Sequence, residues 1–184
     1  YIMKNVKLLV ATAAFAVSSV AVAGPSYTYV DLGYVVADSI DTGAGDIESN
    51  ALALRGSFGF GDIFHVGGSI ADGEVLGGKG DNGGADFLGY GIYFGVNPAI
   101  TDNLDLVARV GYDMGEGDFG APDDAELTAF YLQTGPRMMV SDKLELNAYV
   151  SYTSGELDFK NGSGTTIDYT DIGYQIGGEY YFTP

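Results

Sequence analysis

The chain has 184 residues, with 25 acidic and 8 basic side chains and a formal net charge of −17 at pH 7. Charge of this sign opposes binding to nucleic acid, and no nucleic-acid motif is present. The lack of cysteine excludes a disulfide framework and a thiolate metal site, while 29 glycines argue against a helical bundle because glycine is unfavourable inside helices.

The first segment has the layout of a secretory signal peptide. Residues 3–7 are short and basic, residues 8–20 form an apolar run, and residues 21–23 are a small-residue cleavage pattern. The run is short for a membrane-spanning helix of about 20 residues, so export with cleavage is expected rather than an anchor. Two extra residues precede Met3, the expected initiator. The chain is thus divided into a signal peptide, residues 1–23, and one domain, residues 24–184.

Eight segments of the domain alternate between apolar and polar or small residues. This period of two is typical of strands with two different faces. The last segment is the clearest, with Ile172, Tyr174 and Ile176 on one face and Gly173 and Gln175 on the other. Pro136 weakens the sixth segment, since proline cannot donate to a strand ladder. The expected strands are 26–38, 49–60, 63–71, 85–96, 104–114, 126–140, 144–153 and 168–182.

Short and long connections alternate along these segments. The short ones lie near Gly61, Pro98 and Asp142, and the long ones near Gly45, Gly78, Gly120 and Gly162. An up-and-down barrel with short periplasmic turns and longer outer loops has this alternation, whereas a soluble sandwich does not require it. We predict an all-β, membrane-spanning antiparallel barrel of eight strands whose last strand pairs with its first. The alternatives are a soluble secreted sandwich and a ten-stranded barrel truncated after Pro184.

The two faces of the expected strands differ in charge. One is almost free of charge, and the other carries His65 together with a larger set of ionisable residues. An Arg or Lys facing lipid near the midplane costs about 2–4 kcal/mol, so the charged face is expected to line the interior. We predict an interior polar network, with Arg55 and Arg109 near mid-depth. Its members are Asp31, Arg55, Asp105, Arg109, Arg137, Glu145, Asp171 and Glu179.

The end of the last segment resembles the C-terminal assembly signal of bacterial outer-membrane barrels. The matching residues are Gln175, Gly177, Tyr180 and Phe182. Together with the signal peptide and the alternating connections, they make residues 26–182 resemble the small outer-membrane β-barrel superfamily, the OmpA-type transmembrane domain and its eight-stranded relatives. The resemblance implies an outer-membrane location, contact with lipid and lipopolysaccharide, and folding by the barrel assembly machinery. It specifies architecture better than activity.

The sequence offers little chemistry for catalysis or for a cofactor. The single histidine, His65, follows a short turn and is expected to pack inside the domain, so no catalytic residue is assigned. Acidic residues of the long connections suit calcium or magnesium. However, residues 80–86 lack the full spacing and the terminal glutamate of a calcium loop. We expect no specific metal or cofactor, only loose divalent cations bridging the outer loops to lipopolysaccharide phosphates.

Two functions remain after these exclusions. The first is a non-enzymatic outer-membrane barrel with a structural, envelope-stabilising or surface-interaction role. The second is a narrow passive channel or transporter for small solutes, which interior glycines such as Gly67, Gly91 and Gly173 would leave room for. Side chains usually fill the interior of an eight-stranded barrel, which favours the first function.

Overall fold

The computed structural model describes residues 9–18, 25, 27–41, 46–76, 84–118, 124–160 and 164–181. Within these ranges the backbone forms strands and turns, without helices. The search of the same residues for a helix long and apolar enough to cross a membrane finds none. The prediction of an all-β chain is therefore confirmed for the described part.

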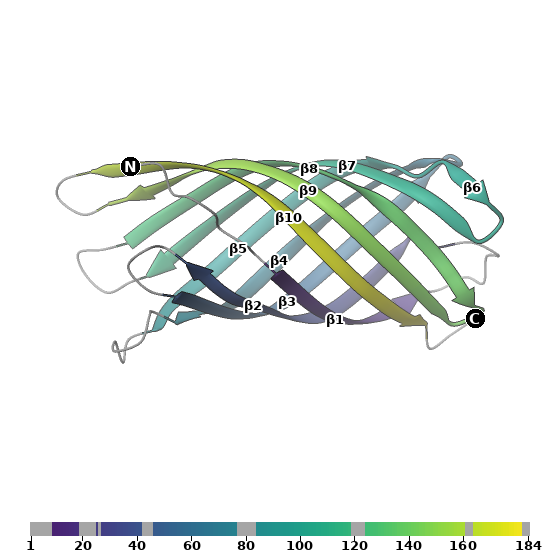
Figure 1. Ribbon diagram of the computed structural model, residues 1–184, viewed down its shortest axis with the longest axis horizontal. Coiled ribbons are helices and arrows are strands. Elements are labelled where there is room, and N and C mark those ends of the chain that lie inside the picture. The colour runs from purple at the N-terminus through teal and green to yellow at the C-terminus, as the bar shows by residue number, and fades with distance from the viewer. Residues whose placement is uncertain are drawn as a thin grey trace.

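Eight long strands carry the fold, as the sequence predicts (Figure 1). Each is antiparallel to the next long strand along the chain. The three-residue strand β6 (Ala99–Thr101) lies in the connection before the fifth of them and pairs with it. The long strands are β2 (Tyr29–Asp41), β3 (Asp46–Phe60), β4 (Phe64–Leu76), β5 (Gly84–Val96), β7 (Leu104–Asp118), β8 (Asp124–Ser141), β9 (Leu144–Phe159) and β10 (Thr165–Tyr181).

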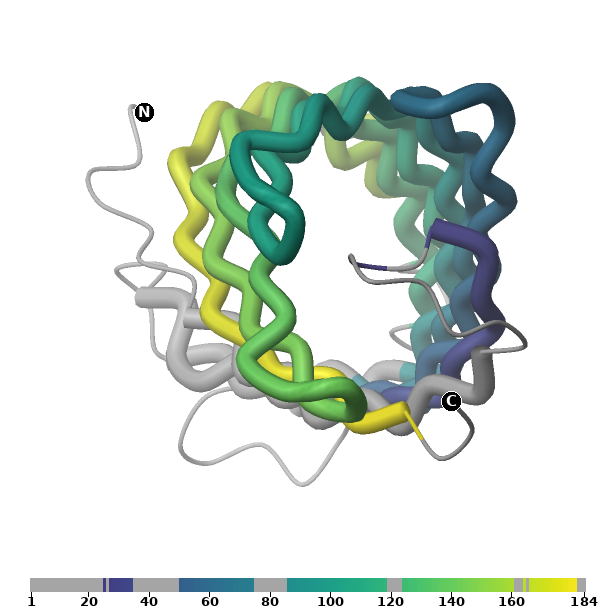
Figure 2. The backbone as a smooth tube through the Cα atoms, turned by 90° about the vertical axis from the view of Figure 1, so that its right-hand side faces the viewer, coloured from purple at the N-terminus to yellow at the C-terminus, as the bar shows by residue number. Residues whose placement is uncertain are grey.

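The sheet curls around a common axis (Figure 2), and the strands are tilted relative to that axis (Figure 1). Its first and last long strands do not pair with each other, so the predicted closure of the last strand on the first is wrong for this structure. Strand β1 (Leu9–Ser18), from the expected signal peptide, lies between them. It is antiparallel to β2 and parallel to β10, with Phe15 opposite both Leu32 and Tyr180. Unpaired strand edges attract any apolar extended segment, which explains this placement.

The strands are longer than the sequence predicts at the end opposite the short turns. Strand β7 continues through Glu116 to Asp118, and β9 continues through Glu156 to Phe159, so much of the expected loop sequence is strand. The alternation persists there with its polarity reversed: Glu156 and Asp158 are exposed, whereas Leu157 is half-buried. The expected strands therefore end too early, because they stop where the outward-facing residues change from apolar to acidic.

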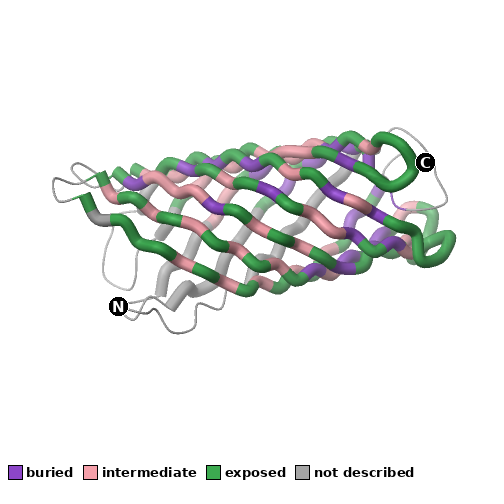
Figure 3. Tube along the Cα trace, turned by 90° about the horizontal axis from the view of Figure 1, so that it is seen from above, coloured by how far each residue is buried: buried purple, intermediate pink, exposed green. Residues whose placement is uncertain are grey.

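The fold is apolar outside and polar inside. Among the described residues, 33 large apolar side chains are exposed, whereas eight apolar residues are buried. The most deeply buried large side chains include Arg137, His65 and Glu145. Buried positions gather toward the end of the short turns (Figure 3). In water-soluble proteins the buried residues are mostly apolar, and Arg and Glu are rarely fully buried unless they are paired.

Candidate functional site

A buried ion pair lies inside the sheet at the end of the short turns. Arg137, on β8, donates from Nε to Glu145 Oε1 at 2.6 Å and from Nη2 to Oε2 at 2.8 Å. The two residues flank the β8–β9 turn, where strand alternation points both inward. Glu179 lies 3.6 Å from the same guanidinium, and Tyr181 donates its hydroxyl proton to Glu145 at 2.7 Å. A two-point arginine–carboxylate contact fixes both side chains in position.

Tyrosines cover this ion pair. The Arg137 guanidinium lies 4.5 Å from the ring centre of Tyr27 and 5.8 Å from that of Tyr29. Tyr27 also donates its hydroxyl proton to Asp105 at 2.9 Å. Burial raises the pKa of the Tyr27 phenol well above its ordinary value, so this side chain remains a neutral donor. We call Tyr27, Asp105, Arg137, Glu145, Glu179 and Tyr181 the interior plug.

A second ion pair lies between neighbouring strands. Asp31 on β2 is directly opposite Arg55 on β3, and the guanidinium Nε donates to the carboxylate at 2.8 Å. Asp31 is 2% exposed, while the Arg55 side chain is 29% exposed. The pair therefore joins a buried carboxylate to a cation that reaches into the open part of the interior.

Arg109 is held by neutral groups. Its Nε donates to His65 Nε2 at 3.1 Å, and its Nη1 donates to Gln133 Oε1 at 3.2 Å. Its guanidinium also lies 5.0 Å from the ring centre of Tyr93 and 5.3 Å from that of Tyr149. None of the ion pairs found in the described ranges includes Arg109.

His65 uses both ring nitrogens for hydrogen bonds. Because Nε2 accepts a hydrogen bond from Arg109, the ring proton is on Nδ1, which donates a hydrogen bond to Asn97 Oδ1 at 2.9 Å. The residue is inaccessible to solvent and lies against the ring of Tyr27, with 4.8 Å between ring centres. This arrangement positions Arg109 and leaves His65 no free nitrogen for proton transfer.

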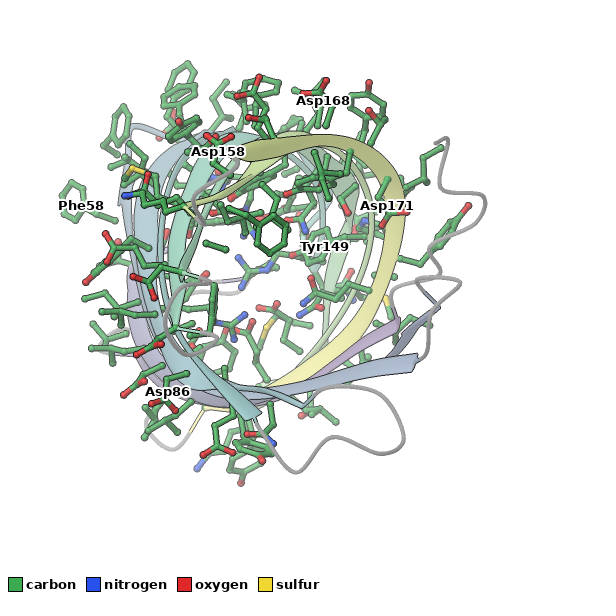
Figure 4. All side chains as sticks on the ribbon, turned by 90° about the vertical axis from the view of Figure 1, so that its left-hand side faces the viewer. Phe58, Asp86, Tyr149, Asp158, Asp168 and Asp171 are labelled. Carbon is green, nitrogen blue, oxygen red and sulfur yellow. The ribbon has the colours of Figure 1, made fainter. Side chains whose placement is uncertain are left out.

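A polar cavity of about 280 Å³ lies beside the plug. Arg55, Arg109, Asp113 and Glu179 contribute its charges, and glycines and neutral polar side chains complete the wall without any aliphatic side chain. Four tyrosines also line it: Tyr29, Tyr93, Tyr131 and Tyr149. Figure 4 shows Tyr149 inside the curled sheet, and Phe58, Asp86 and Asp168 outside it.

The structure places the eight predicted network residues in different surroundings. Asp31, Arg55, Arg137, Glu145 and Glu179 form ion pairs. Asp105 instead bonds to Tyr27, and Arg109 bonds to neutral groups. Asp171 is half-buried and has no ion pair in the part of the chain that the structure describes.

The predicted assembly signal lies on β10. Gln175 and Gly177 line the interior cavity, and Tyr180 is exposed on the outward face. Phe182 lies outside the described residues.

The predicted polar network omits several interior residues. Tyr27 and Tyr181 belong to the plug, and Asp113 and Asn147 line the cavity. Alternation along the expected strands places Tyr181, Asp113 and Asn147 on the inward face, but it does not predict their contacts.

Carboxylates form a collar around the outward face at the loop end. The sequence placed most of them in loops, but they extend from strands and face outward because strand alternation continues beyond the apolar region. Like charges lie opposite each other, as in Asp86 with Asp118 and Glu116 with Glu126, which is unfavourable across strands. The collar comprises Asp72, Glu74, Asp86, Glu116, Asp118, Asp124, Glu126, Glu156, Asp158 and Asp168.

Lys160 bonds to Glu126 of this collar, and this hydrogen bond raises the pKa of the lysine. Within the described ranges, no group of three or more His, Asp or Glu side chains is placed to hold a metal ion.

Comparison with protein-family models, curated proteins and solved structures gives no significant match for this chain. Three structural features bear on its function: the apolar outward face, the interior plug and the polar cavity.

Proposed function

We propose that this chain is a non-enzymatic β-barrel protein of the bacterial outer membrane, with a structural, envelope-stabilising or surface-interaction role. The outward face carries the proposal. It is apolar from Leu104 to Met114 on β7 and from Leu144 to Tyr152 on β9. These lengths match the about 9–11 residues that a tilted strand needs to cross a bilayer.

Aromatic side chains mark both limits of this apolar face. Phe60, Phe64 and Phe94 cluster near the short turns, with ring centres 5.8–6.3 Å apart. Tyr112 and Tyr152 lie near the opposite limit, where the carboxylate collar begins. Aromatic girdles at both interfaces and charge beyond them are features of outer-membrane barrels.

The mature protein, in this proposal, is a closed barrel of eight strands. Residues 1–23 are a signal peptide, so β1 is removed with it. Only this one strand separates β2 from β10. Neighbouring strands lie about 4.8 Å apart, so a small movement would bring the two edges together. Closure would also remove both unpaired edges, which is required inside lipid.

The experiment that tests this proposal uses protein extracted from bacterial membranes. Mass spectrometry should show a chain that begins at Gly24, and NMR in micelles should show direct contacts between β2 and β10. Protein that retains residues 1–23, or lacks β2–β10 contacts, would contradict the closed eight-stranded barrel. Recovery in the inner-membrane fraction or without detergent would contradict the proposed location.

The plug weighs against the alternative, a narrow passive channel or transporter. A channel needs a continuous water path, but Arg137, Glu145, His65 and Val107 are all inaccessible to solvent at the turn end. A paired and solvent-excluded Arg137 and Glu145 do not form the lining of a wide pore. We therefore favour the structural role over passive transport.

The partners follow from the same proposal. Outer-membrane lipid would contact the apolar face, and lipopolysaccharide would lie at the level of the carboxylate collar. Divalent cations, loosely held, would offset the repulsion between collar carboxylates and lipopolysaccharide phosphates. The barrel assembly machinery would recognise the last strand and insert the chain.

A further inference from the structure

Two opposite charges line the interior cavity without an ion-pair partner in the described part of the chain. Arg109 and Asp113 both lie on β7, face inward and contribute to the same wall. The other two interior arginines, Arg55 and Arg137, do have carboxylate partners. A partly desolvated charge without a counter-charge is unfavourable. Arg109 and Asp113 therefore indicate that a charged ligand belongs in the cavity.

The Arg109 guanidinium is held in place but not neutralised. His65 and Gln133 accept its hydrogen bonds, and Tyr93 and Tyr149 lie against it. All four partners are neutral acceptors or aromatic rings, so they fix the orientation of the cation. A cation that is fixed in advance binds a carboxylate with little loss of conformational entropy.

The glycine opposite Asp113 leaves space for its carboxylate. A Cβ at Gly91, the residue directly opposite on β5, would overlap Asp113 Oδ1. Glycine at this position lets the carboxylate lie against the neighbouring backbone. No hydrogen bond or ion pair of Asp113 is found within the ranges that the structure describes, so the group can accept from a ligand.

The spacing of the two charges sets the size of the ligand. Four residues along a strand separate the two Cα atoms by about 13 Å, and the longer arginine side chain can shorten the gap. A single amino acid is too short to reach both groups. The ends of an extended tripeptide are about 10 Å apart, which suits this separation.

The cavity wall also offers groups that a peptide backbone can use. Asn147 is 7% exposed, and its Oδ1 is buried without a hydrogen-bond partner among the described residues. Gln133 and Gln175 line the same cavity and can both donate and accept. A peptide N–H would satisfy Asn147, whereas a simple anion would leave both Asn147 and Asp113 without partners.

We propose that the cavity binds a short, unblocked peptide of about three small residues, with its terminal carboxylate at Arg109 and its terminal ammonium at Asp113. This goes beyond the proposed structural role, because it assigns a ligand class to the interior.

Isothermal titration of the purified protein in detergent micelles tests the proposal, with triglycine as the probe. Triglycine should bind, and blocking either end should weaken binding about ten-fold or more, since each block removes one charge-assisted contact. The blocked probes are N-acetyl-triglycine and triglycine amide. They test each charge on the unaltered protein, so this arm does not depend on the folding of a variant.

Two substitutions assign the charges to residues. Asp113→Asn should weaken triglycine binding and abolish the difference between triglycine and its N-acetyl form. Arg109→Gln should abolish the difference between triglycine and its amide. The matched controls, Asp86→Asn and Lys160→Gln, make the same charge changes outside the cavity and should bind triglycine as the unaltered protein does.

Three results would overturn the proposal. The first is no binding of triglycine by the unaltered protein, and the second is equal binding of the free and blocked peptides. The third is a loss in the Arg109→Gln variant that is equal for triglycine and its amide, because the arginine would then act only on the shape of the cavity.

Discussion

At the scale of single residues, Arg137 and Arg109 show two uses of the same interior side chain. Arg137 is neutralised by a two-point contact with Glu145 and covered by tyrosines. Arg109 lines a cavity and has no carboxylate partner in the part of the chain that the structure describes. Removing one member of a buried pair leaves the other as an unpaired charge, which costs more than replacing both by apolar groups.

The Arg137→Met substitution should lower the free energy of unfolding by about 3–5 kcal/mol, because it leaves Glu145 buried and unpaired. The double variant Arg137→Met/Glu145→Leu should recover much of that loss. Urea unfolding in micelles measures both. Lys160→Met, which breaks an exposed pair, is the control and should change stability little. A double variant less stable than the single one would contradict this account.

Gly135 allows β8 and β9 to approach next to Pro136. A Cβ at Gly135 would overlap the Ala148 carbonyl oxygen, and backbone cannot turn away as a side chain can. We expect Gly135→Ala to destabilise the protein by about 1–3 kcal/mol. Gly56→Ala is the matched control, since the nearest atom to its added Cβ is 4.0 Å away. Thermal unfolding should separate the two variants, and equal midpoints would refute the close approach.

At the scale of elements, each long strand has an apolar part and an acidic end. On β5, Ile92 is exposed in the apolar part, and Asp86 is exposed at the acidic end of the same face. Strand geometry does not change between them, so under the proposed outer-membrane location a change from lipid to water would explain the change in side-chain type. The position of the change therefore marks the expected limit of the bilayer.

Substitutions on β5 test that limit. Ile92→Arg should cost about 2–4 kcal/mol in lipid vesicles, because the cation would face hydrocarbon. Asp86→Arg should cost little, since it would lie opposite Asp118 and relieve repulsion between like charges. Unfolding titrations in vesicles measure both effects. Similar losses for the two variants would place the bilayer limit elsewhere or exclude a membrane-spanning face.

At the scale of the whole molecule, the interior is packed at one end and open beside it. The plug fills the turn end, and the polar cavity lies next to it. Such an interior can hold a ligand without forming a path between the two sides of a membrane.

We therefore expect no discrete channel events when the protein is inserted into planar bilayers. A variant with a thinned plug, Arg137→Ser/Glu145→Ser/Tyr181→Ala, should conduct if it inserts, because three large side chains would be removed from the packed end. Steady single-channel conductance from the unaltered protein would contradict the plugged interior and favour passive transport.

Much of the fold follows from local sequence. Alternation of apolar and polar residues predicts eight strands, and it places Arg55, Arg109 and Arg137 on one face. The predicted strand ends were wrong, because carboxylates such as Glu156 and Asp158 face outward on strands that were expected to end before them. Alternation has a period of two whatever the medium, whereas the polarity of each face depends on whether lipid or water surrounds it.

The candidate site was less predictable than the strands. The sequence indicates which residues face inward, since this depends only on neighbours along the strand. Which carboxylate pairs with which arginine depends on strand register and curvature. Only the tertiary structure therefore decided that Arg137 bonds to Glu145 and that Arg109 has no carboxylate partner among the described residues. The position of β1 between β2 and β10 was likewise decided by tertiary structure, because pairing at an open edge depends on which segment is close enough to fill it.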